Sequence, residues 1–269
     1  MNGGVNSRFS SARVIAVANQ KGGVGKTTTA INLGTAFAIS GRHVLLIDLD
    51  PQGNASTALG IAPERRSPSS YEVLMNGLPV PEAVIETGIA DFDIVPSRVD
   101  LAGAEVELVS AERREFRLRD ALPAVGARYD YVLIDCPPAL NFLTVNALVA
   151  AHSVLIPLQC EFFALEGLSL LLKTVERIKQ NFNPGLHMQG VVLTMYDKRN
   201  NLSNQVARDA RDHFGAKVYD TVIPRNVRVS EAPSHGKPVL LYDHRCAGAE
   251  AYMHLAREVL RREHGEVAP

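Results

Sequence analysis

A glycine-rich segment near the start of the chain carries residues whose types and spacing suit phosphate binding. It reads NQKGGVGKTT from residue 19 to residue 28 and leads into a stretch with helical spacing. Glycines let backbone N–H groups approach an anion without a Cβ in the way, and the positive end of the helix dipole adds to the attraction. Lys26 can then reach the β and γ phosphates of a nucleotide, and the Thr27 hydroxyl is placed to bind Mg²⁺. The phosphate-site residues predicted here are Lys21, Gly22, Gly23, Val24, Gly25, Lys26, Thr27 and Thr28.

One position departs from the standard phosphate-loop pattern. The pattern has a glycine five residues before Gly25, where this chain has Gln20. A second lysine, Lys21, stands instead directly before the glycine pair. A helix start with incidental glycines is the alternative interpretation, but the strand, the turn, the Lys-Thr pair and the helix all agree with a phosphate site.

Aspartates follow two apolar segments that read as buried strands. VLLID ends at Asp48, with Asp50 two residues later in LDPQGN, and YVLID ends at Asp135. Phosphoryl transfer is catalysed mainly by positioning and charge, which makes Asp50 the candidate for orienting the attacking water. We expect Asp135 to hold Mg²⁺ through water, and Asp48 to support either the Mg²⁺ shell or the loop. A helix cap or a turn is the usual role of an isolated aspartate after a strand, but the phosphate loop favours the functional interpretation.

Short apolar segments rich in Val and Ile predict the strands that position these groups. They begin at Val14, Val44, Phe92, Tyr131, Ser153, Gly190 and Thr221. Stretches with helical spacing cover residues 28–40, 101–122, 165–181, 204–214 and 248–262. This alternation predicts an α/β fold: a single-domain P-loop NTPase with a mostly parallel twisted sheet flanked by helices on both faces. Ligands of such sheets bind beyond the carboxyl ends of the strands, where the aspartates and the glycine-rich turn lie.

Composition sets further limits. The chain has 269 residues, of which 46% are hydrophobic, so it can form a large core; we expect an ATPase domain at 13–262 between tails at 1–12 and 263–269. A formal net charge of -1 gives no global attraction to nucleic acid or anionic lipid. The three cysteines are far apart and form no CxxC pair, which argues against a disulfide framework or a zinc site and favours the cytoplasm. No segment has the character of a signal peptide or a membrane span.

The segment KGGVGKTT at 21–28 resembles the deviant Walker A motif of the ParA/MinD/nitrogenase-iron-protein group of ATPases. In that group the extra lysine reaches across a dimer interface, so the resemblance implies that Lys21 acts on the nucleotide of a second subunit. It implies a homodimer that encloses two ATP molecules, with ATP/ADP and Mg²⁺ as cofactors. It also implies that residues 48–54 form switch I, in which Asp50 positions water, and that CPPA after Asp135 forms switch II.

Similarity to the ParA/Soj chromosome-partitioning ATPases extends from Arg13 to about Arg262. Its landmarks are LIPLQCEFFALEGLSLLL from Leu155, VVLTMYDKRNNLSNQV from Val191 and TVIPRNVRVSEAPSHGKPVLLYD from Thr221. In that family the IPRN segment lies near the adenine, which suggests Pro224 and Asn226 as base contacts. A proline that only ends a strand is an equally open interpretation of Pro224.

Two other branches of the group fit less well. A nitrogenase-type iron protein needs cysteines that hold an iron-sulfur cluster between subunits, and Cys136, Cys160 and Cys246 do not lie in matching segments, so no such cluster is expected. A MinD-type protein ends in a basic amphipathic helix for lipid binding, whereas REHGEVAP at the end of this chain contains acids and few bulky apolar residues. A MinD-like membrane-associated regulator and an ATPase that positions a protein cargo remain the alternatives.

DNA is the expected binding partner for the ParA/Soj branch of the group. From Tyr196 to Arg262 twelve basic residues stand against eight acidic ones, a mild excess that solvated helices often show. The resemblance implies sequence-independent contacts to DNA phosphates by both subunits of an ATP-closed dimer, so that the protein is nucleoid-associated. It further implies slow ATP hydrolysis, stimulated by a ParB-type centromere-binding partner, that drives chromosome or plasmid segregation. The candidate DNA contacts are Arg199, Arg225, Arg228, Lys237 and Arg245.

Overall fold

A single sheet organises the computed structural model, which describes residues 12–162, 164–263 and 265. The strand order across its eight described strands is β3-β4-β2-β5-β1-β6-β7-β8. β3 runs antiparallel to β4, and the other neighbouring pairs are parallel. The strands are β1 Arg13–Val17, β2 Val44–Asp48, β3 Ile85–Ile89, β4 Phe92–Val95, β5 Tyr131–Asp135, β6 Ser153–Gln159, β7 His187–Tyr196 and β8 Val218–Pro224.

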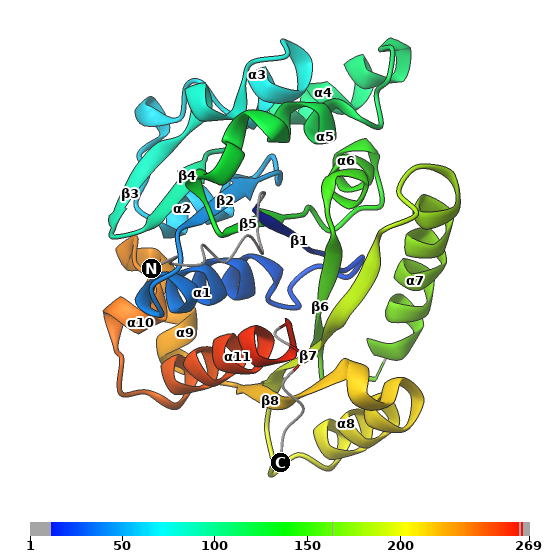
Figure 1. The fold of residues 1–269 in the computed structure, drawn as a ribbon. Coiled ribbons are helices and arrows are strands. Elements are labelled where there is room, and N and C mark those ends of the chain that lie inside the picture. Colours follow the sequence, from blue (N-terminus) through cyan, green and yellow to red (C-terminus); the bar gives the residue numbers. More distant parts are fainter. Residues whose placement is uncertain (1–11, 163, 264, 266–269) are drawn as a thin grey trace, which may run out of the picture.

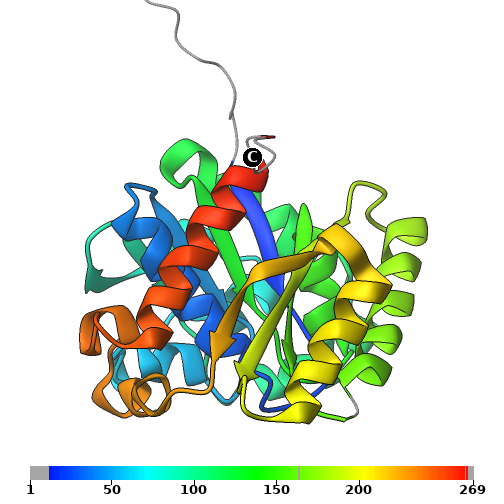
Figure 2. The same cartoon turned by 90° about the horizontal axis from the view of Figure 1, so that it is seen from below.

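Helices cover both faces of the sheet (Figure 1). The core on one face includes buried side chains of α1, α2, α10 and α11, and the core on the other includes those of α3 to α8. Figure 2 shows the edge strand β8 with α11 on one side and α8 on the other. The helices are α1 Lys26–Ile39, α2 Asn54–Ala58, α3 Ser70–Met75, α4 Leu101–Glu107, α5 Arg117–Ala121, α6 Phe142–Ala150, α7 Ala164–Asn181, α8 Asn201–Phe214, α9 Val227–Glu231, α10 Val239–Tyr242 and α11 Ala247–Glu263.

The predicted α/β fold is confirmed, because β1, β2, β5 and β6 are almost fully buried and take the centre of the sheet. The sequence analysis missed β3, an edge strand. Its residues IETGI alternate between partly buried and exposed positions, so they lack the continuous apolar run of a central strand. A short turn with Asp91 at a φ of 60° joins β3 to β4 and makes this pair antiparallel.

The single helix predicted over 101–122 was wrong. The structure divides that segment into α4, the 3₁₀ turn η3 (Leu108–Ser110) and α5. Ala111 is extended and Arg113 has a φ of 52°, a left-handed conformation that a helix does not contain. The break lets Phe116 pack edge-on against Phe182, with the guanidinium of Arg113 over the Phe116 ring. Tertiary packing of one aromatic ring therefore overrides the helical pattern.

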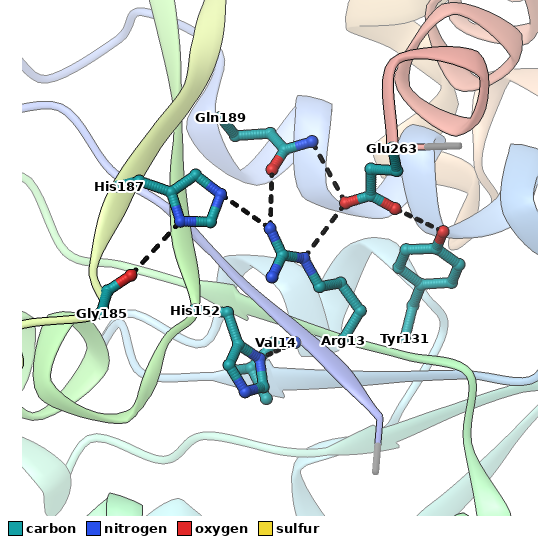
Figure 3. Close-up of polar contacts among 8 residues, drawn as sticks. All are labelled: Arg13, Val14, Tyr131, His152, Gly185, His187, Gln189 and Glu263. Carbon is teal, nitrogen blue, oxygen red and sulfur yellow. Dashed lines mark hydrogen bonds and ion pairs between the residues drawn. The ribbon is translucent and has the colours of Figure 1, made fainter. Parts of the chain in front are cut away.

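A polar cluster joins β1, β7 and the end of α11 at the edge of the sheet opposite the carboxyl ends of β1 and β5 (Figure 3). The Arg13 guanidinium donates to Glu263 at 3.2 Å and lies 2.8 Å from Nε2 of His187. Glu263 also accepts a hydrogen bond from the Tyr131 hydroxyl at 2.6 Å. Directly before β6, Nδ1 of His152 accepts from the Val14 amide at 2.9 Å. These contacts connect the start of β1, the first described strand, to the end of α11, the last described helix.

Glu263 therefore belongs to α11, whereas the sequence analysis assigned it to a tail. Most of the two predicted tails falls on residues 1–11, 264 and 266–269, outside the described residues. Among the described helices, none combines the length and the apolar character that crossing a bilayer requires.

Candidate nucleotide-binding and hydrolysis site

The phosphate loop connects β1 to α1 at the carboxyl ends of the parallel strands. Gly25 has a φ of 86° and Gly23 a φ of 73°, conformations that glycine adopts without the strain of a side chain. A Cβ built on Gly23 would meet no atom within 4 Å, so the space above the loop is open. No side chain caps the first turn of α1, and its N–H groups remain available to an anion.

Buried polar contacts hold this loop in place. The Asn19 side chain donates to the Pro157 carbonyl at 2.7 Å and accepts from the Lys21 amide at 3.0 Å. On the other side of the loop, the Thr194 hydroxyl donates to the Val24 carbonyl at 2.8 Å. Because β6 and β7 carry Pro157 and Thr194, the parallel sheet itself fixes the loop's shape.

The two lysines of the motif lie differently. Lys26 is buried, and its ammonium donates to the Lys21 carbonyl at 3.0 Å, across the turn. Burial lowers the pKa of Lys26, although the nearby Asp135 carboxylate opposes the shift. Lys21 is partly exposed, and its ammonium lies 3.0 Å from Glu161 of the same chain. Lys26 thus faces the loop's interior, whereas Lys21 is held at its rim.

Asp135 lies at the tip of β5, level with Val17 on β1 and Asp48 on β2. Its carboxylate is fully buried, and neither oxygen receives a hydrogen bond of good geometry within the described residues, although the Thr27 hydroxyl lies close enough to lower its pKa. Burial, reinforced by Asp48, raises the pKa of Asp135 well above its usual range, while Thr27 and Lys26 act in the opposite direction. A buried carboxylate without a well-formed hydrogen bond is costly, so the site fits a cation.

Carboxylate and hydroxyl oxygens are the ligands that Mg²⁺ prefers, and Asp135 lies beside Thr27 at the start of α1. Within the described chain no group of three or more His, Cys, Asp or Glu side chains could hold a metal ion by itself. A Mg²⁺ ion at Asp135 would therefore need phosphate oxygens and water to complete its shell, as Mg²⁺ in nucleotide sites does.

Asp48 organises the loop after β2. Its carboxylate accepts from the Ser56 amide at 2.9 Å, from the Ser56 hydroxyl at 2.8 Å and from the Asp50 amide at 3.2 Å. Of the two roles left open for Asp48, the geometry favours support of the loop, because both oxygens are already engaged there. Burial raises the pKa of Asp48, and the two hydrogen bonds from Ser56 limit the rise.

Asp50 begins the turn into α2 and is largely buried. One of its oxygens accepts from the Gln52 amide at 3.0 Å. No hydrogen bond to its second oxygen occurs in the part of the chain that the structure describes. Asp50 is also close enough to the phosphate loop to influence the pKa of Lys26. A water molecule between Asp50 and a bound phosphate is compatible with this arrangement.

Sequence reasoning missed two residues that shape this site. Ser56 donates two hydrogen bonds to Asp48, as described above, and Arg66 is hydrogen-bonded to α2. The buried Arg66 guanidinium donates to the Ile61 carbonyl at 2.7 Å and to the Thr57 hydroxyl at 2.8 Å. Ser56 could have been suspected, because a hydroxyl soon after an acidic turn often caps it. Arg66 carries no such signal, since an arginine in a polar loop is usually exposed.

The predicted adenine contacts lie at the end of β8. Pro224 lines a cavity of about 780 Å³, together with Tyr196 and Arg225. The Asn226 side chain caps α9 by accepting from the amides of Arg228 and Val229. Asn226 thus has a local structural role that leaves only its NH₂ group for a base.

The candidate DNA contacts differ in their surroundings. Arg199 and Arg225 line the same 780 Å³ cavity, whereas Lys237 lies in a separate pocket of about 280 Å³ beside Thr27 and Thr28. Acidic partners offset two of the arginines: Arg199 pairs with Asp197 at 3.1 Å, and Arg228 pairs with Glu231 at 2.9 Å and with Asp243 at 3.5 Å. Arg245 donates through its backbone amide to Asp243.

The cysteines lie apart from this chemistry. All three thiols are free, Cys136 and Cys160 are buried, and Cys246 is partly exposed. Burial, together with the neighbouring Asp135 carboxylate, raises the pKa of the Cys136 thiol. A thiol held in its neutral form is a poor nucleophile, so Cys136 serves packing after β5.

Comparisons with known proteins agree with this geometry. A family model described as an AAA domain matches residues 12–188. The chromosome partitioning protein ParA of Caulobacter vibrioides is 64% identical over 253 residues, which cover 93% of this chain and 95% of that protein. The sporulation initiation inhibitor protein Soj of Bacillus subtilis is 53% identical over 247 residues, covering 92% of this chain and 98% of that protein.

A solved structure is also similar over nearly its whole length. It is described as cobyrinic acid a,c-diamide synthase from Mycobacterium smegmatis with bound ATP analogue and magnesium. Its TM-score is 0.84 at 39% identity, and the match covers 95% of this chain and 97% of that one. This sequence identity is lower than that of ParA from Caulobacter vibrioides or Soj from Bacillus subtilis. The phosphate loop, the second lysine and these similarities show that the chain belongs to the ParA/Soj family of chromosome-partitioning ATPases.

Proposed function

We propose that the protein is an ATP-dependent switch for DNA partitioning. With ATP and Mg²⁺ bound, two chains dimerise face to face and bind DNA without sequence preference. Slow hydrolysis, accelerated by a ParB-type partner, returns the chains to monomers that leave the DNA. The observation that carries the proposal is the phosphate loop with two lysines, one buried and one at the rim, beside the buried carboxylate of Asp135. The names of the bacterial relatives support the partitioning role.

Each residue of the site has a distinct task in this proposal. The amides from Gly22 to Thr28 and the Lys26 ammonium bind the phosphates. Thr27 and, through water, Asp135 would hold Mg²⁺, and the ion would neutralise charge on the phosphates. Asp50 orients the attacking water, and Asp48 holds the turn that positions Asp50. Solved relatives with ADP or an ATP analogue and magnesium support these cofactors.

Dimerisation supplies the remaining positive charge. Lys21 leaves Glu161 and contacts the phosphates held by the second subunit, so ATP links the two chains. DNA binding then depends on two copies of a weak surface, for which Arg199, Arg225, Arg228, Lys237 and Arg245 remain the candidates. Because phosphate contacts add up, doubling a small patch raises affinity far more than twofold.

One assay tests the proposal against its rivals. Binding to arbitrary duplex DNA and to anionic vesicles is measured with ATP and with ADP across a salt series. We expect ATP-dependent retention on DNA that falls steeply with salt, and no retention on vesicles. Lys26→Ala is the control, since it should bind neither nucleotide nor DNA. Retention on vesicles would indicate a membrane-associated regulator instead, and retention on neither surface would favour an ATPase that positions a protein cargo.

A further inference from the structure

An apolar stripe runs along the solvent side of α4 and η3. Val99, Val106 and Val109 are 78%, 77% and 58% exposed, and Ala102 is exposed between them. Three or four residues separate each of these positions from the next, so all of them share one helix face. Val99 belongs to this run because the Ala102 amide donates to its carbonyl, which starts the helical turn. We call Val99, Ala102, Val106 and Val109 the valine stripe.

The valine stripe has no role in holding the helix on the protein. Leu101, Ala104 and Leu108 on the opposite face are fully buried and belong to the core on that side of the sheet. One apolar face is enough to fix a surface helix, and a second one in contact with water indicates an interaction site. Figure 1 shows α4 in the outer layer, beside α3 and α5.

Carboxylates border the valine stripe on both sides. Helical spacing places Glu105 on one side, and Asp100 and Glu107 on the other. Between Val99 and Ala111 the sequence contains no lysine or arginine. Arg98 neutralises Asp100, whereas Glu105 and Glu107 form no ion pair in the described chain. Glu105 and Glu107 therefore keep their negative charge along the two sides of the stripe, whereas at its end the Arg114 guanidinium donates to the Val109 carbonyl at 2.6 Å.

Neutral donors hold these two carboxylates in position. The Tyr71 hydroxyl donates to Glu107 at 3.0 Å, and the Asn141 side-chain amide donates to Glu105. Such bonds fix the direction of a carboxylate without removing its charge. A protein that covers the stripe must therefore supply apolar side chains for its centre and cations for its borders.

We propose that the valine stripe is the docking site of a basic amphipathic segment from a partner protein. Such a segment presents apolar side chains between lysines or arginines. An anionic bilayer is a poor occupant, because Glu105 and Glu107 repel it. A second copy of the chain would bring the same carboxylates against themselves in a twofold-symmetric contact.

The stripe is connected to the hydrolysis site through Asn141. While its amide holds Glu105, its carbonyl oxygen accepts from the Thr144 amide at 3.1 Å and caps α6. Five residues separate Asn141 from Asp135, and the first four of them, CPPA, form the segment that the sequence analysis identified as switch II. A partner on the stripe thus contacts α4, whose Glu105 is bonded to the residue that caps α6 shortly after switch II. The identity of the partner rests on the proposed function, so a ParB-type protein is the probe.

Photocrosslinking tests the location directly. p-Benzoylphenylalanine replaces Val106 in one full-length variant and Ile39, 53% exposed at the end of α1, in a matched control. After irradiation with the cognate ParB-type protein, an adduct at 106 and none at 39 is the expected result. No adduct at 106, equal adducts at both positions, or an adduct at 106 between two copies of this chain would overturn the proposal.

Two substitutions test the chemistry of the stripe. Val106→Glu should weaken binding of the ParB-type protein at least about tenfold and reduce its stimulation of ATP hydrolysis, while Ile39→Glu changes neither. Glu107→Gln keeps an acceptor for Tyr71 but removes charge, so the affinity should fall less steeply with salt than it does in the wild type. Wild-type affinity in Val106→Glu, or an unchanged salt slope in Glu107→Gln, contradicts the docking site.

ATP-dependent DNA binding is scored separately from these results. A crosslink at 106 in a protein that never binds DNA would support the docking site and reject the switch. ATP-dependent DNA binding together with wild-type partner affinity in Val106→Glu would support the switch and reject the docking site.

Discussion

The Lys21 ammonium lies 3.0 Å from the Glu161 carboxylate of the same chain. In the proposed dimer the same ammonium must contact the nucleotide of the other chain, so the intrachain pair has to break first. Both side chains are more than a third exposed, and such pairs contribute only about 0–1 kcal/mol. The pair is therefore a weak restraint that ATP binding can overcome.

Substitutions of these two residues should act in opposite directions. Glu161→Gln frees Lys21 in both subunits and should raise the ATP-dependent dimer constant by up to about 30-fold, because two pairs of up to about 1 kcal/mol each no longer have to break. Lys21→Ala should leave the monomer folded and prevent ATP-dependent dimers. Sedimentation velocity with ATP and with ADP measures both effects. An intact ATP dimer of Lys21→Ala would refute the role of this lysine across the interface.

Asp50→Ala should separate ATP binding from hydrolysis. The Asp50 carboxylate accepts a hydrogen bond from the Gln52 amide in the turn after β2 and none from the phosphate loop in the described chain, so we expect its removal to leave that loop folded. The variant should bind ATP normally and accumulate as a dimer on DNA, with turnover reduced about 100-fold or more. Phosphate release and DNA retention are measured on the same sample. Rapid turnover in this variant would mean that another group positions the water.

Asp135→Asn should remove the effect of Mg²⁺ while sparing the fold. Burial already disfavours the charged form of Asp135, so the ligand-free variant should lie within about 1 kcal/mol of the wild type. ATP with Mg²⁺ should stabilise the wild type more than ATP with EDTA does, and the variant should lose this difference. Thermal unfolding with and without Mg²⁺ provides the measurement. A variant that keeps the full Mg²⁺ increment would show that the ion binds elsewhere.

Acidification should destabilise the polar cluster around Arg13. Burial, assisted by the Arg13 guanidinium, lowers the pKa of both His152 and His187. The Lys217 ammonium acts in the same direction on His187, and Glu263 opposes it. Between its lowered value and the ordinary value of about 6.5, the folded chain binds fewer protons than the unfolded chain. Stability is therefore complete above about pH 6.5 and declines as the pH falls below it.

Urea unfolding at about pH 7.5 and about pH 5.5 checks this dependence. His187→Gln removes one of the two titrating groups and should reduce the loss of stability between the two values. His244→Gln, an exposed histidine outside the cluster, serves as the control. The same loss in His187→Gln as in the wild type would exclude His187 as a source of the effect.

The sequence alone determined the class of fold and the chemistry of the phosphate site. Continuous apolar strands that alternate with helical stretches specify a parallel sheet, because only a sheet covered on both faces buries such strands. The glycine-rich loop specifies its own backbone, since Gly23 and Gly25 adopt left-handed conformations. The loop and the aspartates at the tips of neighbouring strands must then meet at one edge of the sheet.

Tertiary structure decided which groups are already engaged and which are free. Asp48 and Asp135 look alike in the sequence, yet Ser56 occupies one carboxylate and leaves the other without a well-formed hydrogen bond. Glu161 is distant from Lys21 along the chain and meets it only because β6 lies beside β1. The second apolar face of α4 likewise became visible only when the first was seen to be buried. Contacts between residues far apart in the chain depend on how the elements pack, which local pattern does not encode.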